Sequence, residues 1–377
     1  MGSSRYHVAV VGGGPAGLAA AVTLVRDGLD VIVIERTDYQ SLRVGEHVAP
    51  GTKPLLEALG VSAALQSAQH ASCPGIRSVW GGSEPVDRDY LFHPNGEGVN
   101  LARPDFDLGF ASLAERLGAE IVTDARLSGL ARSGGSWQVS FERRRQASTI
   151  RAEVVIDATG RAASVAKRLG AKPIVYDDLI GIVGRAASSS RQDHTIAIEA
   201  IETGWWYSAG LADGTLVATF LTDSDLVETS RTGRVSTWHR QLQASAITAG
   251  RIADADAAID LEIRTARTQR LDVTDGEGWL AVGDAAMSFD PLSSEGISKG
   301  LEWGRKVAGL VAAWCRGDER AVPAYREELD RAFSEYLLAR YRYYAAEKRW
   351  SGAPFWRRRQ VAPRPIAGSA VRSPTKS

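Results

Sequence analysis

The chain has 377 residues, of which 45 are Lys or Arg and 45 are Asp or Glu. This length suffices for one large domain or two smaller ones, and the balanced charge gives no reason to expect binding to nucleic acid or to a membrane surface. Cys73 and Cys315 are the only cysteines, which excludes a disulfide framework or a zinc cluster and fits a reducing compartment. No apolar segment resembles a signal peptide or is long enough to span a bilayer. We therefore expect a soluble cytoplasmic protein without a metal site.

The first informative segment, residues 6–35, predicts a strand, a Gly-rich turn, a helix and a second buried strand. Gly12 permits the tight turn, Gly14 allows the backbone to approach a pyrophosphate, and Gly17 allows close packing of helix and strand. The start of the helix presents free N–H groups to phosphates. Glu35 ends the second strand at the distance where a carboxylate binds a ribose hydroxyl. The segment predicts dinucleotide binding without deciding between NAD and FAD.

The polar loop that follows, residues 41–50, holds Arg43, Glu46 and His47 next to the nucleotide end of the predicted sheet. Arg43 suits a bidentate contact with a phosphate, and a surface salt bridge is an equally good interpretation. For His47 we favour a loop histidine without a catalytic role.

Residues 73–101 predict short strands and turns, and Arg103 opens a helix. A β-meander follows over residues 119–156. Its last strand ends in Asp157-Ala158-Thr159-Gly160, and such small residues indicate that the backbone there approaches another group closely.

Three adjacent aromatic residues, Trp205, Trp206 and Tyr207, lie in the middle of a strand-like region. Successive side chains of a strand point to opposite faces, so the three cannot share one face. We expect one face to meet the core and the other a cavity. Packing of these aromatics in the core or at an interface is the alternative.

The second segment with chemical content, residues 279–314, predicts a strand, a loop and a long helix. Asp284 follows the strand and is well placed for a ribityl or ribose hydroxyl. The helix starts at Gly296, where its positive dipole end favours an anionic group.

The C-terminal part, from Ala321 to Trp350, predicts helix, with aromatic and basic residues alternating from Tyr336 to Arg359. Such alternation can indicate nucleic-acid binding, but we favour aromatics that dock the helix on the body with the arginines pointing outward. A surface for a protein partner is the second option. The remaining Pro- and Ser-rich residues predict a disordered tail.

Taken together, the Gly12–Gly17 turn with Glu35, the Asp157–Gly160 segment, and Gly283-Asp284 with Pro291 and Gly296 resemble the flavoproteins of the para-hydroxybenzoate hydroxylase type. The resemblance covers residues 6–311 and implies FAD. It implies that Arg43 and Arg103 lie near the pyrophosphate, that Asp284 contacts the ribityl chain, and that the Pro291–Ile297 loop lines the isoalloxazine. The residues implied to bind FAD are Gly12, Gly14, Pro15, Ala16, Gly17, Glu35, Arg36, Arg43, Arg103, Asp284, Pro291, Gly296 and Ile297.

The resemblance also implies the fold class, which is α/β (α+β) with a Rossmann-type FAD-binding domain and β-meander, an antiparallel-sheet substrate domain and a C-terminal helical segment. We expect the FAD-binding domain at 1–80, 103–175 and 275–315, and the substrate domain at 81–102 and 176–274. The helical segment is expected at 316–356, and the disordered tail at 357–377.

Within this family, Val44-Gly45-Glu46 and residues 290–297 resemble the flavin-dependent halogenases. The departures argue against halogenation. Residues 75–80 lack the lysine that captures hypohalous acid, Ser293 replaces the active-site Glu, and Glu295 would repel a halide. The Gly-Trp-Trp-Tyr segment, residues 290–297 and the C-terminal Arg-Trp and Phe-Trp-Arg-Arg pattern look closer to flavoproteins that modify tryptophan in peptides during maturation of quinone cofactors.

The resemblance implies an FAD-dependent monooxygenase that hydroxylates an electron-rich aromatic such as an indole through a flavin C4a-hydroperoxide. The substrate is a small molecule or is tethered to a peptide or carrier. Trp205, Trp206 and Tyr207 would form its stacking wall, and Glu46 or Glu295 would accept a proton. Without a separate nicotinamide domain, NAD(P)H binds transiently or a partner reductase supplies reduced flavin. The alternatives are a halogenase, a reductase or dehydrogenase of the same fold, and a maturation factor that mainly binds a protein partner.

Overall fold

The computed structural model describes residues 4–40, 43–67, 69–228, 230–254, 260–318 and 321–363. Within these residues, one large sheet forms the core of the first lobe and has the order β19-β20-β11-β1-β2-β8, with β10 and β9 added beside β11. Its strands are β1 (Arg5–Val11), β2 (Val31–Ile34), β8 (Glu120–Val122), β9 (Ala125–Ser133), β10 (Ser136–Arg143), β11 (Gln146–Asp157), β19 (Asp275–Gly276) and β20 (Trp279–Ala281).

The central strands of this sheet are parallel and apolar, because they are buried in one cluster with residues of neighbouring helices and of the β-meander strands β9 and β10. Val8 to Val11 of β1 face Val154 to Asp157 on one side and Val31 to Ile34 on the other. Their carboxyl ends therefore meet at one edge, where ligands bind in open α/β sheets.

The second lobe is built on a mostly antiparallel sheet with the order β17-β13-β16-β15-β14-β5-β6. Its strands are β5 (Gly75–Val79), β6 (Val86–Asp89), β13 (Leu179–Ala187), β14 (Ile196–Ile201), β15 (Gly204–Gly210), β16 (Thr215–Asp223) and β17 (Leu261–Thr265). Since β5 pairs with β14, residues 75–80 belong to this lobe, and the predicted boundary at residue 80 was placed too late.

Two small sheets lie between the lobes, with the orders β3-β7-β4 and β12-β18-β21. Their strands are β3 (His47–Val48), β4 (Ala71–Cys73), β7 (Gly98–Asn100), β12 (Pro173–Val175), β18 (Gln269–Leu271) and β21 (Met287–Ser288).

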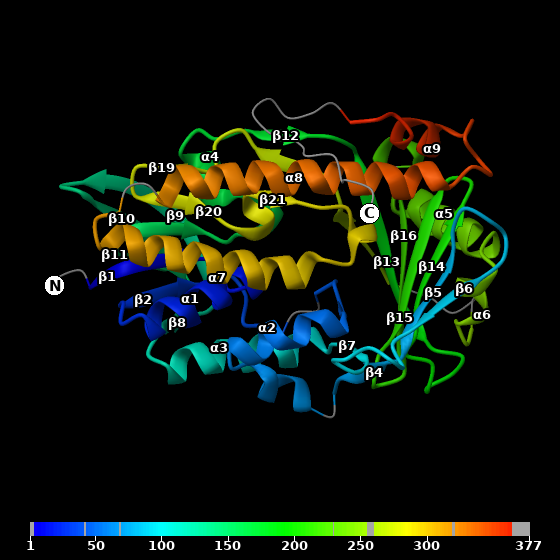
Figure 1. The fold of residues 1–377 in the computed structure, drawn as a ribbon, viewed down its shortest axis with the longest axis horizontal. Coiled ribbons are helices and arrows are strands. Elements are labelled where there is room, and N and C mark those ends of the chain that lie inside the picture. The colour runs from blue at the N-terminus through cyan, green and yellow to red at the C-terminus, as the bar shows by residue number, and fades with distance from the viewer. Residues whose placement is uncertain are drawn as a thin grey trace, which may run out of the picture.

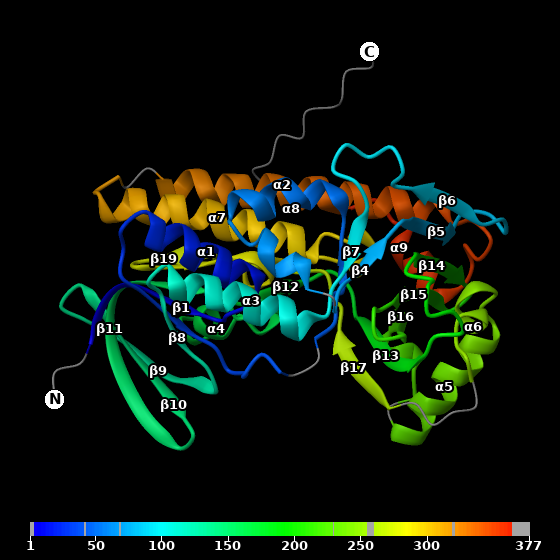
Figure 2. The same ribbon diagram turned by 90° about the horizontal axis from the view of Figure 1, so that it is seen from below.

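The helices complete the layers (Figures 1 and 2). Helix α5 packs Trp238 on the outer face of the second sheet. Helix α8 runs along the long axis of the molecule and lies over parts of both lobes (Figure 1). The helices are α1 (Pro15–Arg26), α2 (Lys53–Ala58), α3 (Arg103–Arg116), α4 (Ser164–Arg168), α5 (Arg231–Gln243), α6 (Ile247–Gly250), α7 (Gly296–Cys315), α8 (Ala321–Ala346) and α9 (Pro354–Arg359).

The architecture confirms the predicted fold class: a Rossmann-type sheet with a β-meander, a second antiparallel sheet and C-terminal helices. The start of the predicted tail at residue 357 was wrong, because α9 continues to Arg359 and that side chain is buried. Residues 364–377 of the predicted tail lie outside the described residues.

Candidate active site

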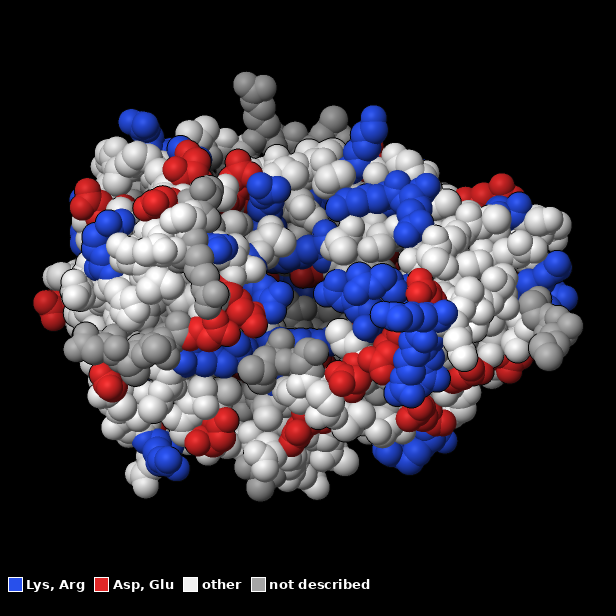
Figure 3. Space-filling view, turned by 180° about the vertical axis from the view of Figure 1, so that it is seen from behind, with Lys and Arg blue, Asp and Glu red and all other residues white. Residues whose placement is uncertain are grey.

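A cavity of about 340 Å³ lies between the two lobes. On the side of the first lobe it is lined by the start of α1, the loop before β3, the start of α3 and the start of α7. On the other side it is lined by β13, β15 and β16. On the face opposite to that of Figure 1, Lys and Arg side chains gather around a central hollow (Figure 3). Three arginines, Arg103, Arg161 and Arg264, line the cavity.

The Gly-rich turn has the geometry expected for a phosphate cradle. A Cβ atom on Gly12 would lie 2.2 Å from the carbonyl oxygen of Ala158, and one on Gly17 would lie 1.9 Å from that of Gly12. Gly14 is different, since a Cβ there would meet nothing within 4 Å, and the residue lines the cavity. It is also the N-cap of α1 without a side-chain cap, so the helix start is left for a ligand. These residues fit the diphosphate of a dinucleotide.

The carboxylate of Glu35 is buried and already has several protein partners. It accepts hydrogen bonds from the backbone N–H of Gly13 (2.6 Å) and from Thr37, and it pairs with Arg43 at 2.9 Å. Neither Glu35 nor Arg36, which is exposed, lines the cavity. Their contact with the ADP half of FAD stays a prediction.

The two arginines expected at the pyrophosphate lie in different places. Arg103 lines the cavity, donates to the carbonyl oxygens of Val44 and Gly45 and pairs with Asp107. Arg43 does not line the cavity, and it bridges Glu35 and Asp107. Of the two interpretations of Arg43, the ion pair therefore describes this structure, although the pair is largely buried rather than on the surface.

Asp284 lines the cavity and faces Arg161 at 3.5 Å, and its contact with the ribityl chain stays a prediction. Burial raises the pKa of Asp284, and the charge of Arg161 opposes that shift. The sequence reasoning missed Arg161, whose only signal was its place directly after the Asp157–Gly160 segment. The arginine also donates to the carbonyl oxygen of Phe289 (2.6 Å), so it ties Asp284 to the loop that precedes α7.

This loop reaches the cavity through Pro291, and the start of α7 reaches it through Gly296 and Ile297. The start of α7 has no side-chain cap. Glu295 is half-exposed, pairs with Lys299 at 3.0 Å and does not line the cavity. Its prediction as a catalytic residue was wrong, because the loop turns its side chain to the outside.

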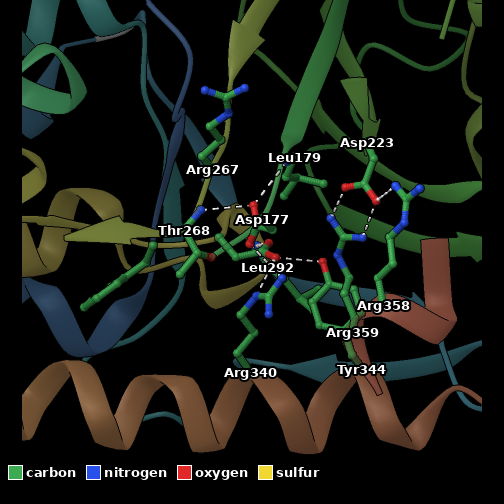
Figure 4. A network of polar contacts seen from close by, with 12 residues as sticks. Asp177, Leu179, Asp223, Arg267, Thr268, Leu292, Arg340, Tyr344, Arg358 and Arg359 are labelled. Atoms are coloured by element: carbon green, nitrogen blue, oxygen red, sulfur yellow. Dashed lines mark hydrogen bonds and ion pairs between the residues drawn. The ribbon is translucent and has the colours of Figure 1, made fainter. Parts of the chain in front are cut away.

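Side chains of α8 contact Asp290, the first residue of the same loop, and the sequence did not predict these contacts. Tyr344 donates to Asp290 Oδ2 (2.7 Å), Arg340 Nε lies 3.3 Å from the same oxygen, and Tyr336 Oη accepts the backbone N–H of Asp290 (2.7 Å). Arg340 also pairs with Asp177 at 2.8 Å (Figure 4). Asp290 is 1 % exposed, so these contacts are shielded from water.

The prediction that the C-terminal arginines point outward was wrong for Arg340 and Arg359. Arg359 is 3 % exposed and pairs with the buried Asp223, which Arg358 also contacts (Figure 4). The predicted docking is confirmed for Tyr336, Tyr344, Phe355 and Trp356, which are buried, but not for Tyr343, which is exposed.

Of the predicted aromatic wall, only Tyr207 lines the cavity. Trp205 is on the same face of β15 but packs against Trp80 and donates to Tyr344 Oη (3.0 Å). Trp206 points to the opposite face and packs between Phe220 and Trp238, with ring centroids 5.2 and 5.3 Å away. The assignment of Trp205 and Trp206 to the substrate was therefore wrong, since both are core residues.

Glu46 lies in the loop before β3, and His47 is the first residue of β3. Both line the cavity. Glu46 is 3 % exposed, and this burial raises the pKa of its carboxyl. His47 has its ring nitrogens 3.1 Å from Asn100 Oδ1 and 3.4 Å from Tyr90 Oη, as expected for a structural histidine. Glu46 is thus the carboxylate best placed to act on a bound molecule.

The described part of the chain offers neither a metal site nor a membrane span. Within it, no three His, Cys, Asp or Glu side chains gather in a way that could hold a metal ion. No helix there is both long and apolar enough to cross a membrane.

Comparison with known proteins identifies the family. Residues 5–335 match the FAD binding domain family. The chain is 30 % identical to the FAD-dependent oxidoreductase LodB of Marinomonas mediterranea, over 94 % of this chain and 97 % of LodB. It is 24 % identical to a tryptophan 2-halogenase of Chondromyces crocatus, over 95 % of this chain and 71 % of that protein.

Among solved structures, the flavin-dependent halogenase CmlS superposes with a TM-score of 0.84 at 22 % identity, covering 96 % of this chain and 68 % of CmlS. The peptidyl tryptophan dihydroxylase QhpG superposes with a TM-score of 0.82 at 23 % identity, covering 97 % of this chain and 81 % of QhpG. These two likenesses concern the fold. The family match and the similarity to LodB together show that the chain belongs to the FAD-binding monooxygenase and halogenase superfamily and is an FAD-dependent oxidoreductase.

Proposed function

We propose that the protein is an FAD-dependent monooxygenase that hydroxylates an electron-rich aromatic ring of the indole type, free or tethered to a peptide or carrier. One oxygen atom of O₂ enters a ring C–H bond, and the other leaves as water. The two electrons required come from NAD(P)H or from reduced flavin supplied by a reductase. Bound FAD supplies the activation of oxygen.

The observation that supports the proposal most directly is the composition of the cavity. Its walls between the two lobes include Val183, Leu221 and Ile297, with Tyr207 on the side opposite to the Gly-rich turn. A flat aromatic ring fits such a space, and exclusion of water protects reactive oxygen species from side reactions.

The chain's own residues have separate tasks in this proposal. Gly14 and the start of α1 bind the diphosphate, and Arg161 with Asp284 fixes the ribityl side. The loop from Asp290 to Ile297 bounds the cavity on the flavin side. Tyr207 and Glu46 face the substrate. Two other carboxylates line the cavity, but Asp284 faces Arg161, and Asp290 is held by Tyr344 and Arg340.

The names of similar proteins agree with an aromatic substrate. One relative is a tryptophan 2-halogenase, and one structural neighbour is a peptidyl tryptophan dihydroxylase. Halogenation is the competing reaction within the superfamily. Against it, no lysine lines the cavity among the described residues, and residue 77, within the segment where a halogenase lysine is expected, is an arginine paired with Asp87.

The deciding experiment is turnover of candidate indoles, including tryptophan within peptides, under ¹⁸O₂ with mass spectrometry of the product. We expect a mass gain from one or more ¹⁸O atoms and no dependence on halide. Incorporation of halide, or turnover without oxygen, would overturn the proposal. Mixing the holoprotein with NADH or NADPH without oxygen identifies the electron donor, since rapid bleaching of the flavin rules out strict dependence on a reductase.

A further inference from the structure

One carboxylate oxygen in the cavity lacks the partner that a buried polar group normally has. Glu46 Oε2 accepts the backbone N–H of Gly45 at 3.1 Å, but Glu46 Oε1 is buried and has no hydrogen-bond partner. Tyr207 lines the same cavity. Most buried polar atoms are paired, so an orphaned carboxylate oxygen that faces a cavity indicates a missing ligand.

The nearby arginines do not pair with Glu46. Arg103 is engaged with the carbonyl oxygens of Val44 and Gly45 and with Asp107. Arg185 contributes only a longer-range attraction, without a hydrogen bond or an ion pair to Glu46. The free oxygen of Glu46 is therefore available inside the cavity.

Tyr207 lies close enough to Glu46 for the two side chains to interact electrostatically. Burial, and then the negative charge of Glu46, raise the pKa of the Tyr207 hydroxyl, which stays neutral at physiological pH. The cavity around these two groups includes apolar side chains of Val44, Val183 and Leu221. A single acceptor with a neutral hydroxyl in such surroundings suits a flat, neutral ring that carries one N–H group.

We propose that Glu46 Oε1 and the Tyr207 hydroxyl form a recognition site for the N–H group of an aromatic heterocycle, and that this site selects N–H heterocycles over isosteric rings without a donor. The inference rests on the proposed function only in taking the substrate to be aromatic. Sites built to bond a donor reject analogues that lack it, because the acceptor is then left buried and unpaired.

The test compares indole with benzothiophene, which has nearly the same shape but sulfur in place of N–H. Binding to the oxidised holoprotein is followed by the change in flavin absorbance, without turnover. We expect wild-type protein to bind indole at least about tenfold more tightly, which is about 1.4 kcal/mol. Glu46→Gln should narrow this preference, Glu46→Leu should abolish it, and Tyr207→Phe should reduce it less. Glu57→Gln, which changes an exposed carboxylate on α2, is the matched control and should keep it.

Several outcomes would overturn the inference: no saturable binding of indole, no preference in wild-type protein, or a preference that survives in both Glu46 variants. The N–H group of the flavin ring is a second candidate donor to Glu46 Oε1. FAD affinity of each variant is therefore measured in parallel, and a tenfold loss in Glu46→Leu with the indole preference intact assigns Glu46 to the flavin instead. Because binding is measured without catalysis, a retained preference with no hydroxylated product would contradict only the monooxygenase proposal.

Discussion

Tyr344, near the end of α8, donates a 2.7 Å hydrogen bond to Asp290, 54 residues earlier in the chain. Asp290 begins the loop that lines the cavity, and its other oxygen accepts the backbone N–H of Leu292. The C-terminal helix is therefore part of the support of the candidate active site. This also weakens the alternative of a docking surface, because Tyr336, Tyr344 and Trp356 are buried within the protein itself.

We predict that Tyr344→Phe lowers the free energy of unfolding by about 1–3 kcal/mol, because it leaves the buried Asp290 and Trp205 groups short of a partner. The measurement is urea denaturation of the FAD-loaded protein. Tyr343→Phe is the control, since Tyr343 is 58 % exposed and this substitution should change stability by less than about 0.5 kcal/mol. Equal effects of the two variants would contradict the role of Tyr344.

Alanine substitutions at two arginines of α9 should change the free energy of unfolding by very different amounts. Arg359→Ala removes the partner of Asp223 and a cation that lies 3.8 Å from the Phe355 ring, so we expect a loss of about 3 kcal/mol. Arg357 is exposed, and Arg357→Ala should be nearly neutral. Thermal and urea unfolding measure both. A stable Arg359→Ala protein would mean that Arg358, which also contacts Asp223, compensates for the loss.

Alanine substitutions at two glycines of the first turn should have different effects, one on folding and the other on cofactor binding. Gly12→Ala must place a Cβ against the backbone of Ala158 at φ +108°, so we expect a loss of several kcal/mol or failure to fold. Gly14 has φ −80° and open space beside it. Gly14→Ala should therefore leave the apoprotein as stable as wild type but weaken FAD binding at least about tenfold, or ~1.4 kcal/mol.

Titration of FAD into each apoprotein, with apoprotein melting temperatures alongside, measures both quantities. Gly309→Ala, at an exposed position of α7 with no atom within 4 Å of the new Cβ, controls for the general effect of alanine. Unchanged FAD affinity in Gly14→Ala would show that this turn does not hold the cofactor.

Glu46 should make the stability of the apoprotein depend on pH. Burial raises its pKa in the folded state, and Arg103 and Arg185 oppose this effect. A carboxyl with a raised folded pKa stabilises the protein while protonated, and this contribution is lost as pH rises through the folded pKa. Glu46→Gln cannot ionise, so the variant should gain stability relative to wild type as pH increases. The gain should be about 1.4 kcal/mol for each pH unit that separates the unfolded pKa of Glu46 from its folded pKa.

The other groups around Glu46 do not interfere with this experiment. Burial lowers the pKa of His47 and raises that of Tyr207, and both groups are present in the two proteins, so their own titration cancels in the difference between wild type and Glu46→Gln. Unfolding free energies of both proteins between about pH 5 and 8 provide the test. A constant difference across this range would show that Glu46 is ionised throughout.

The cofactor-binding half of the protein could be predicted from local sequence alone. The turn at Gly12 depends on a positive φ that only glycine supplies easily, and the alternating or continuous apolar runs specify strands locally. These signals lie within short segments, so they can be read without knowing what packs on them. The fold class and the family followed from them.

Which side chains face the cavity depends instead on how distant segments pack. Strand alternation separates Trp206 from Tyr207, but the aromatic cluster of α8 and α9 decides that Trp205 lies in the core. Glu295 turns outward toward Lys299, while Arg340 and Arg359 turn inward. A buried arginine is stable only opposite a carboxylate, and here the carboxylates come from segments more than a hundred residues away in the chain, such as Asp177 and Asp223. No local pattern contains that information.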